Sequence, residues 1–235
     1  MVKQRNHSES LESLQKKITA CELCPRLVRH CRRLAVEKRR MYRQEEYWGK
    51  PVPSFGDPRA ELLIVGLAPG AHGANRTGRM FTGDRSGDFL YRALFEAGFC
   101  NQPVSRRRED GLKLRNCYIT AALRCAPPDN KPQPDEARNC RPYLRQELQL
   151  LNRVRAVLAL GRIAFDAYLR VVAEGREFPR ISSFRFAHGA CHELPGGLPR
   201  LHASYHPSQQ NTQTGKLTPA MMHDVLRNIR RFLTG

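Results

Sequence analysis

The sequence is short of acidic residues. Its 22 Asp and Glu face 40 Lys and Arg, which gives a formal net charge of +18. A surplus of this size favours a polyanionic partner over a merely soluble basic protein. The basic residues also cluster, at 26–43, 106–108 and 227–231, and such clustering is typical of a surface that follows phosphates.

The sequence also lacks long apolar runs and a dense set of cysteines. No apolar run approaches the roughly 18 residues of a membrane span, and residues 1–10 are polar, so we expect a cytoplasmic protein. Eight cysteines in 235 residues are too few for a secreted disulfide scaffold, and we expect thiols or metal ligands. Internal repeats and low-complexity tracts are absent, and the length fits one domain over residues 1–235.

Short apolar runs alternate with segments of helical periodicity along the chain. This alternation predicts an α/β fold in which helices cover both faces of a parallel sheet. An N-terminal segment of about residues 8–45 precedes it, with two helices on either side of a cysteine turn. We predict strands at 62–65, 117–122, 156–160 and 201–204, and helices at 11–20, 27–42, 89–97, 135–151, 162–172 and from 219 onward.

Residues 66–84 follow the first predicted strand and carry the densest chemistry of the chain. Five glycines among these nineteen residues allow a non-helical loop whose backbone amides turn inward to hold an anion or a developing negative charge. Asn75, Arg76 and Asp84 add polar and charged groups, and Phe81 adds a ring for stacking. No Lys stands before Ser or Thr here, which excludes a Walker phosphate loop.

Two further polar loops, at 123–134 and 205–217, also follow predicted strands. The carboxyl ends of parallel strands meet at one edge of a sheet, where α/β proteins bind their ligands. We therefore expect these loops and residues 66–84 to form one site. The arginine-rich segment 101–114 fits neither strand nor helix and is expected to be an excursion from the sheet.

Four of the cysteines fall into two pairs. Cys21 and Cys24 are spaced C-x2-C, which lets both sulfurs face one metal, whereas fourteen residues separate Cys125 from Cys140. Together they predict a four-thiolate site that ties the N-terminal helices to the sheet. Zinc and a [4Fe-4S] cluster both fit this spacing, and four unrelated buried cysteines are the alternative. The remaining cysteines are expected in the core: Cys31, Cys100, Cys117 and Cys191.

Residues 66–70 and 75–84 form one long motif, GLAPG and NRTGRMFTGD, and residues 206–218 form a second, HPSQQNTQTGKLT. Both resemble motifs of the uracil-DNA glycosylase superfamily, specifically of its family 5 (type B) branch of iron-sulfur enzymes. The likeness runs from Cys21 to Leu233. It implies a three-layer α/β/α sandwich around a four-stranded parallel sheet. It also implies base excision repair by monofunctional hydrolysis of the N-glycosidic bond of uracil in DNA.

The cysteine spacing also fits this family. The resemblance therefore implies a structural [4Fe-4S] cluster, rather than zinc, on Cys21, Cys24, Cys125 and Cys140.

Two positions differ from other branches of the superfamily. Many members carry an acidic residue beside the first glycine of the first motif to handle the hydrolytic water, and this chain has Leu67 there. Related enzymes read uracil with an asparagine where this chain has alanine, in the strand Ile119-Thr120-Ala121-Ala122. Family 5 enzymes are similar in both respects and act on a wider range of deaminated bases, so the resemblance implies relaxed base choice.

Catalysis is assigned to three residues. His206 follows a strand, and as a neutral imidazole it is expected to donate to a base oxygen as negative charge develops there. Asp84 is expected to orient water or stabilise the cationic sugar, with helix capping as its alternative role. Asn130 is expected to read the base edge, with an ordinary turn position as its alternative.

The flipped base is expected to stack on Phe81, whose alternative is a core aromatic. Backbone amides of residues 67–71 supply further donors, and residues 209–217 are expected to enter the minor groove. The predicted substrate-binding residues are Gly66, Leu67, Ala68, Pro69, Gly70, His72, Asn75, Phe81, Ser208 and Asn211.

DNA is the predicted partner, and we expect it to be double-stranded. We expect the protein to be a monomer and to be associated with the nucleoid. One alternative is a non-catalytic iron-sulfur or zinc protein that binds DNA through its charge. A second is an enzyme that acts on free nucleotides at the same edge of the sheet. A basic surface large enough for a duplex argues against the second alternative.

Overall fold

The computed structural model describes residues 10–235, so residues 1–9, with the start of the segment predicted at about 8–45, lie outside the described part. Within it, six strands form one sheet in the order β1-β3-β2-β4-β6-β5. Their bounds are β1 Phe55–Gly56, β2 Leu62–Gly66, β3 Cys117–Ala121, β4 Ala156–Leu160, β5 Cys191–His192 and β6 Arg200–Ser204.

The four central strands, β3, β2, β4 and β6, run parallel, as the sequence predicts. Strand β1 pairs antiparallel with β3 at one edge, and β5 pairs antiparallel with β6 at the other. The sequence analysis does not find these edge strands, because two residues are too few for an alternation to be recognised. Strand β2 lies between β3 and β4, at the point where the chain order reverses, and such a switch point is where ligands bind in sheets of this kind.

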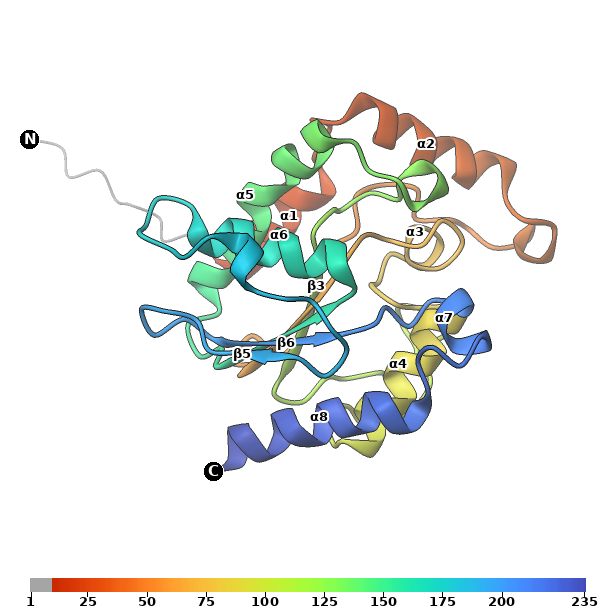
Figure 1. The fold of residues 1–235 in the computed structure, drawn as a ribbon. Helices are drawn as coiled ribbons and strands as arrows, with labels where there is room; N and C mark the ends of the chain where they lie inside the picture. Colours follow the sequence, from red (N-terminus) through yellow and green to blue (C-terminus); the bar gives the residue numbers. More distant parts are fainter. Residues whose placement is uncertain (1–9) are drawn as a thin grey trace, which may run out of the picture.

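Helices cover both faces of the sheet and make three layers (Figure 1). Successive residues of a strand point to opposite faces. Leu62 and Ile64 of β2 therefore pack under α4 (Arg85–Glu96) and α8 (Pro219–Thr234), whereas Leu63 and Val65 pack under α5 (Pro134–Leu150) and α6 (Arg162–Ala173). Helix α1 (Leu11–Thr19) packs on α5. The predicted α/β/α sandwich is confirmed.

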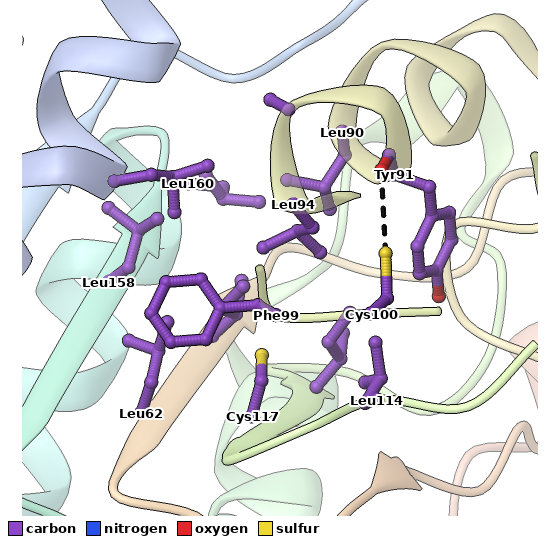
Figure 2. Packing of buried hydrophobic residues seen from close by; sticks show 14 of the residues in the cluster. Leu62, Leu90, Tyr91, Leu94, Phe99, Cys100, Leu114, Cys117, Leu158 and Leu160 are labelled. Carbon is purple, nitrogen blue, oxygen red and sulfur yellow. Dashed lines mark hydrogen bonds between the residues drawn. The ribbon is translucent and has the colours of Figure 1, made fainter. Parts of the chain in front are cut away.

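Figure 2 shows the core on the α4 side of the sheet, where Cys100 and Cys117 lie among leucines and the ring of Phe99. The Cys100 thiol donates to the Tyr91 carbonyl oxygen at 3.6 Å. These two cysteines and Cys31 are buried, as predicted. The same prediction is wrong for Cys191, which is exposed because it lies on the two-residue edge strand β5.

One predicted helix and two predicted loops are corrected. The helix predicted at 27–42 is α2, Pro25–Glu37, and it stops at Lys38, whose φ is 46°; a separate 3-10 turn, η1, spans Arg40–Tyr42. The segment 66–84 is not wholly non-helical, since Ala74–Thr77 forms one helical turn, α3. Loop 205–217 likewise contains α7, Gln209–Gln213. The remaining short elements are the 3-10 turns η2, Pro128–Asn130, and η3, Ile181–Ser183.

A buried ion pair joins the sheet to the helix layer near the cysteines. The Arg124 guanidinium donates to the Glu147 carboxylate at 2.6 Å, and the two side chains are 1% and 0% exposed. Thr120 of β3 and Ser54 also donate to this carboxylate. A buried charge is tolerated only when it is paired and hydrogen-bonded, so this network fixes the start of the 123–134 loop against α5.

Candidate active site

The glycine loop, residues 66–84, leaves the carboxyl end of β2 and is closed by one buried side chain. The Arg76 guanidinium donates to the His72 carbonyl oxygen and to the Gly83 carbonyl oxygen, both at 2.8 Å. It also pairs with the Glu45 carboxylate, and its side chain is only 6% exposed. Because one planar group binds two distant backbone carbonyls, the loop is held in one conformation.

A second buried arginine attaches this loop to the excursion at 101–114. The Arg79 guanidinium donates to both carboxylate oxygens of Asp110 at 2.8 Å and to Ser105 Oγ at 2.9 Å. It also donates to Thr82 Oγ1 at 2.9 Å. The excursion therefore supports the glycine loop from behind.

Phe81 and His206 face each other across the ends of two strands. Their ring centroids are 6.0 Å apart and the rings are tilted by 33°. A Cβ on Gly66, the last residue of β2, would lie 2.9 Å from Phe81 Cζ, and a Cβ on Gly161, just after β4, would lie 3.3 Å from His206 Cβ. Glycine at these two positions makes room for the aromatic pair. Phe81 itself has φ of 53°, a costly conformation that marks functional sites.

The electrostatic state of His206 follows from its surroundings. Burial lowers its pKa to about 4, so the imidazole is neutral at pH 7 and carries one N–H donor. Asn211 Nδ2 donates to the His206 carbonyl oxygen at 2.9 Å, and Ser208 Oγ caps α7 by accepting from the Asn211 amide. Ser208 and Asn211, predicted to bind substrate, here fix the backbone that carries His206.

Asp84 is the N-cap of α4 and presses on the glycine loop. Its Oδ1 accepts from the Gly87 amide at 2.9 Å, which is the alternative role that the sequence allowed. Its Oδ2 lies 2.8 Å from the position of a Cβ on Gly70 and 1.8 Å from that of a Cβ on Gly73. Burial raises the pKa of the Asp84 carboxyl. Only glycine at 70 and 73 permits this close approach of carboxylate and backbone.

His72 and Asn75 connect the glycine loop to its neighbours. His72 Nδ1 lies 3.1 Å from the hydroxyl of Tyr47, and burial, then the charges of Arg39 and Arg76, lowers the His72 pKa. Asn75 is fully buried, and its Nδ2 donates to the Cys31 and Ala71 carbonyl oxygens at 3.4 Å.

Other residues predicted to bind substrate lie within the same structural unit. Pro69 is buried, Gly70 accepts a backbone hydrogen bond from Asn75, and Leu67 and Ala68 pack against the apolar cluster that contains the cysteines. Their side chains support the pocket wall, so any contact of residues 67–71 with a base would come from the backbone.

Asn130 lies apart from these residues. It is exposed, has φ of 56°, and ends η2. It lines a separate hollow with Lys131 of the same loop, Arg138 of α5 and Ile163 of α6. Within residues 10–235 it makes no interaction with Asp84 or His206, and its geometry is that of a turn residue.

The four paired cysteines gather where α2, α5 and the 123–134 loop meet. Cys24, Cys125 and Cys140 are buried in one apolar cluster, and Cys21 is half-buried. Burial, with the nearby thiols of Cys24 and Cys21, raises the pKa of Cys140 to about 11. In the described part of the chain, no three Cys, His, Asp or Glu side chains converge closely enough to hold a single metal ion. Thiolate ligands suit either zinc or an iron-sulfur cluster.

A large open groove, of about 1060 Å³, runs beside Asp84. Tyr42 and Glu45 line it together with four exposed arginines: Arg85, Arg92, Arg106 and Arg107. These four arginines form no ion pair with a described residue. Unpaired arginines in an open groove favour a ligand with phosphates.

Three structural roles were missed by sequence reasoning. Arg79 closes the loop from behind, Gly161 makes room for His206, and Tyr47 holds His72. An arginine inside a glycine-rich motif and a glycine directly after a strand were available signals for the first two. The contact between Tyr47 and His72 has no local signal, because it depends on how two loops pack.

No helix within residues 10–235 is long and apolar enough to cross a membrane. The model of the Uracil DNA glycosylase superfamily matches residues 53–230, which include both motifs and the aromatic pair. This match spans more than half of the chain.

Three relatives share about half of their residues with this chain. A type-5 uracil-DNA glycosylase of Thermus thermophilus is 52% identical over 220 residues, which cover 94% of this chain and 97% of the relative. One of Mycobacterium tuberculosis is 50% identical over 224 residues, 94% of this chain and 81% of the relative. One of Pyrobaculum aerophilum is 46% identical over 211 residues, 90% and 88% of the two chains. The chain with the Phe81–His206 pair at its sheet edge therefore belongs to the uracil-DNA glycosylase superfamily.

Proposed function

We propose that this protein is a monofunctional DNA glycosylase that hydrolyses the N-glycosidic bond of uracil in DNA and leaves an abasic site for base excision repair. The observation that carries the proposal is the neutral His206 imidazole facing Phe81 at the carboxyl ends of the parallel strands. Two of the relatives named above are type-5 uracil-DNA glycosylases, and each aligns with 94% of this chain.

The reaction breaks the bond between C1′ of deoxyribose and N1 of uracil. The bonding electron pair leaves with the base, so negative charge develops on the uracil ring and positive character on the sugar. The base must first leave the duplex, at a cost of a few kcal/mol. Stacking on Phe81 returns about 1 to 3 kcal/mol, and the arginines along the groove bind the backbone.

His206 then donates a hydrogen bond to a uracil oxygen as the charge grows. A neutral donor suits this role, because it strengthens its bond in the transition state without having bound an anion in the ground state. Within residues 67–71, the backbone amides other than that of Pro69, which has no N–H, supply further donors to the same base.

Asp84 is the proposed acidic residue that acts on the sugar and on the attacking water. Leu67 occupies the position where many members of the superfamily carry their acid, and Asp84 Oδ2 lies against the glycine loop three and six residues further along, at Gly70 and Gly73. From there the carboxylate stabilises the cationic sugar or orients the water. The water oxygen adds to C1′, and one proton of the water ends on the departing uracil anion, which becomes neutral uracil. The same residue keeps its capping bond to Gly87.

The absence of a reading asparagine supports action on further deaminated bases, such as hypoxanthine and xanthine. Thr120, Ala121 and Ala122 are buried at the end of β3, where alanine gives neither a donor nor an acceptor to select uracil. A pocket that recognises a base by stacking, by His206 and by backbone amides, without a reading asparagine, accepts several bases.

We also propose a [4Fe-4S] cluster on Cys21, Cys24, Cys125 and Cys140. When bound, it supplies a rigid covalent link between the N-terminal helices and the sheet. Ion pairing between Arg26 of α2 and Glu136 of α5, at 2.7 Å, already joins the same elements. The proposal treats residues 1–235 as one domain that acts as a monomer on duplex DNA at the nucleoid.

The protein is expected to release uracil from a duplex that carries one uracil, as detected by strand breakage after alkali treatment. His206→Ala should lower the single-turnover rate about 10²- to 10³-fold, the usual cost of losing one such donor. His223→Ala, a histidine of α8 outside the pocket, is the control and should keep the wild-type rate. Absence of breakage with the wild type would favour the non-catalytic DNA-binding alternative.

The same assay with Asn130→Gly, which keeps the turn and removes the side chain, tests the predicted role of Asn130.

Asp84→Asn separates the two roles of this side chain. Asparagine also caps helices well, so the thermal midpoint should stay within about 2 °C of the wild type, while the rate falls at least about tenfold through loss of the charge. Burial raises the Asp84 pKa, so wild-type activity should fall as the pH drops through that raised value. An Asp84→Asn enzyme with full rate would reduce Asp84 to a helix cap.

The purified protein should be brown and contain about four iron and four sulfide per chain. Cys140→Ala should lose the colour and melt at lower temperature, whereas Cys191→Ala, at the exposed edge strand, should keep both properties. A colourless protein with one zinc per chain would contradict the proposed cluster and leave the glycosylase proposal intact.

A further inference from the structure

The segment between α2 and Tyr47 exposes an apolar side chain among unpaired charges. Met41 is 68% exposed, and Arg39, Arg40 and Arg43 are exposed and form no ion pair or side-chain hydrogen bond with a described residue. We call residues 39–43 the arginine tip. In Figure 1 this segment follows α2 and projects at the margin of the molecule. A solvent-exposed methionine held between cations has no role in the packing of the fold.

The arginine tip is tied to the glycine loop on its inner side. The ring of Tyr42 stacks under the Arg76 guanidinium at 3.9 Å, and Glu45 pairs with the same guanidinium. Arg76 is also the group that binds the glycine loop at the His72 and Gly83 carbonyl oxygens. The position of the tip is therefore coupled to the wall of the proposed base pocket.

A second set of contacts attaches the far side of the tip. The Arg39 amide donates to the Tyr47 hydroxyl, which lies 3.1 Å from His72 Nδ1. Trp48 and Gly49 donate backbone hydrogen bonds to the carbonyl oxygens of Arg76 and Asn75, at 2.8 and 3.0 Å. A tip with such attachments at both ends presents Met41 in a defined place rather than on a loose loop.

The surroundings of the tip favour duplex DNA as its partner. Tyr42 of the tip lines the same groove as Arg85, Arg92, Arg106 and Arg107. The unpaired arginines of the tip are therefore neighbours in sequence of a residue that faces the arginines of the groove. Arginine side chains of this kind bind phosphates on both sides of a site. Methionine is flexible and apolar, and side chains of this type are used as wedges between base steps.

We propose that Met41 inserts into the duplex beside the flipped nucleotide, while Arg39, Arg40 and Arg43 bind the adjacent phosphates. This inference rests on the proposed function. It places the wedge on the α2 side of the pocket, whereas residues 209–217 approach from the β6 side. Insertion lowers the cost of flipping because the wedge replaces the stacking that the neighbouring bases lose.

The test compares uracil excision from duplex and from single-stranded oligonucleotides under single-turnover conditions. Met41→Ala should lower the duplex rate by about tenfold or more and leave the single-strand rate within about twofold, because a single strand has no base stack to open. Met41→Leu, which keeps an apolar wedge, should restore most of the duplex rate. Val36→Ala is the matched control: Val36 is 82% exposed on α2, before the tip, and the variant should match the wild type.

Fluorescence of 2-aminopurine next to the uracil gives a second readout that does not need catalysis. Binding of the wild type should raise this fluorescence through unstacking, and Met41→Ala should remove most of the rise. An unchanged duplex rate, an equal loss on single strands, or an equal loss in Val36→Ala would each overturn the proposal. If the wild type excises nothing but still unstacks the duplex, the proposed function fails and the wedge stands.

Discussion

The bidentate grip of Arg76 on the His72 and Gly83 carbonyl oxygens is the interaction on which the candidate site depends. A loop with five glycines has a high conformational entropy, and an open loop would place neither Phe81 nor Asp84. The buried guanidinium removes this freedom from both ends at once. It also carries the stacked Tyr42 and the paired Glu45, so the same group orients the pocket and the arginine tip.

The pocket itself is a consequence of parallel strands that end at one edge. β2 brings the glycine loop, β6 brings His206, and β4 between them ends in Gly161. Burial at this edge keeps His206 neutral, while the helix N-terminus above Asp84 supplies the amide that holds one of its oxygens. The proposed donor, His206, thus follows β6, whereas the proposed acid, Asp84, is held against the glycine loop at Gly70 and Gly73 by the start of α4.

The sequence predicts the architecture well because its signals are local. Strands β2 and β4 are apolar on both faces, and Thr218 and Pro219 start α8 with a standard cap. The family resemblance adds the motifs, and the comparisons confirm that family. The exposure of Cys191 and the helical turn at Ala74–Thr77 are missed, because edge pairing and one-turn helices are decided by packing rather than by periodicity.

The sequence locates some residues of the candidate site better than others, because the place of a loop residue depends on packing. Phe81 and His206 face each other at the strand ends, and Asp84 lies against the glycine loop, since all three belong to long recognisable motifs. Asn130 belongs to a loop whose direction depends on η2 and on contacts with α6, and it lies in a different hollow. Ser208 and Asn211 lie in the motif but serve the backbone. Motif membership therefore locates a site more reliably than it assigns roles within it.

The central claim is that a neutral His206 faces the base. Its most direct measurement is a pH titration of the His206 ring nitrogens by NMR, in the free protein and in a complex with duplex DNA that carries an uncleavable deoxyuridine analogue. We predict a ring that stays neutral from pH 5 to 8, with its N–H signal shifted when the base binds. A ring that titrates near 6.5, or whose signals do not respond to the bound base, would contradict the account.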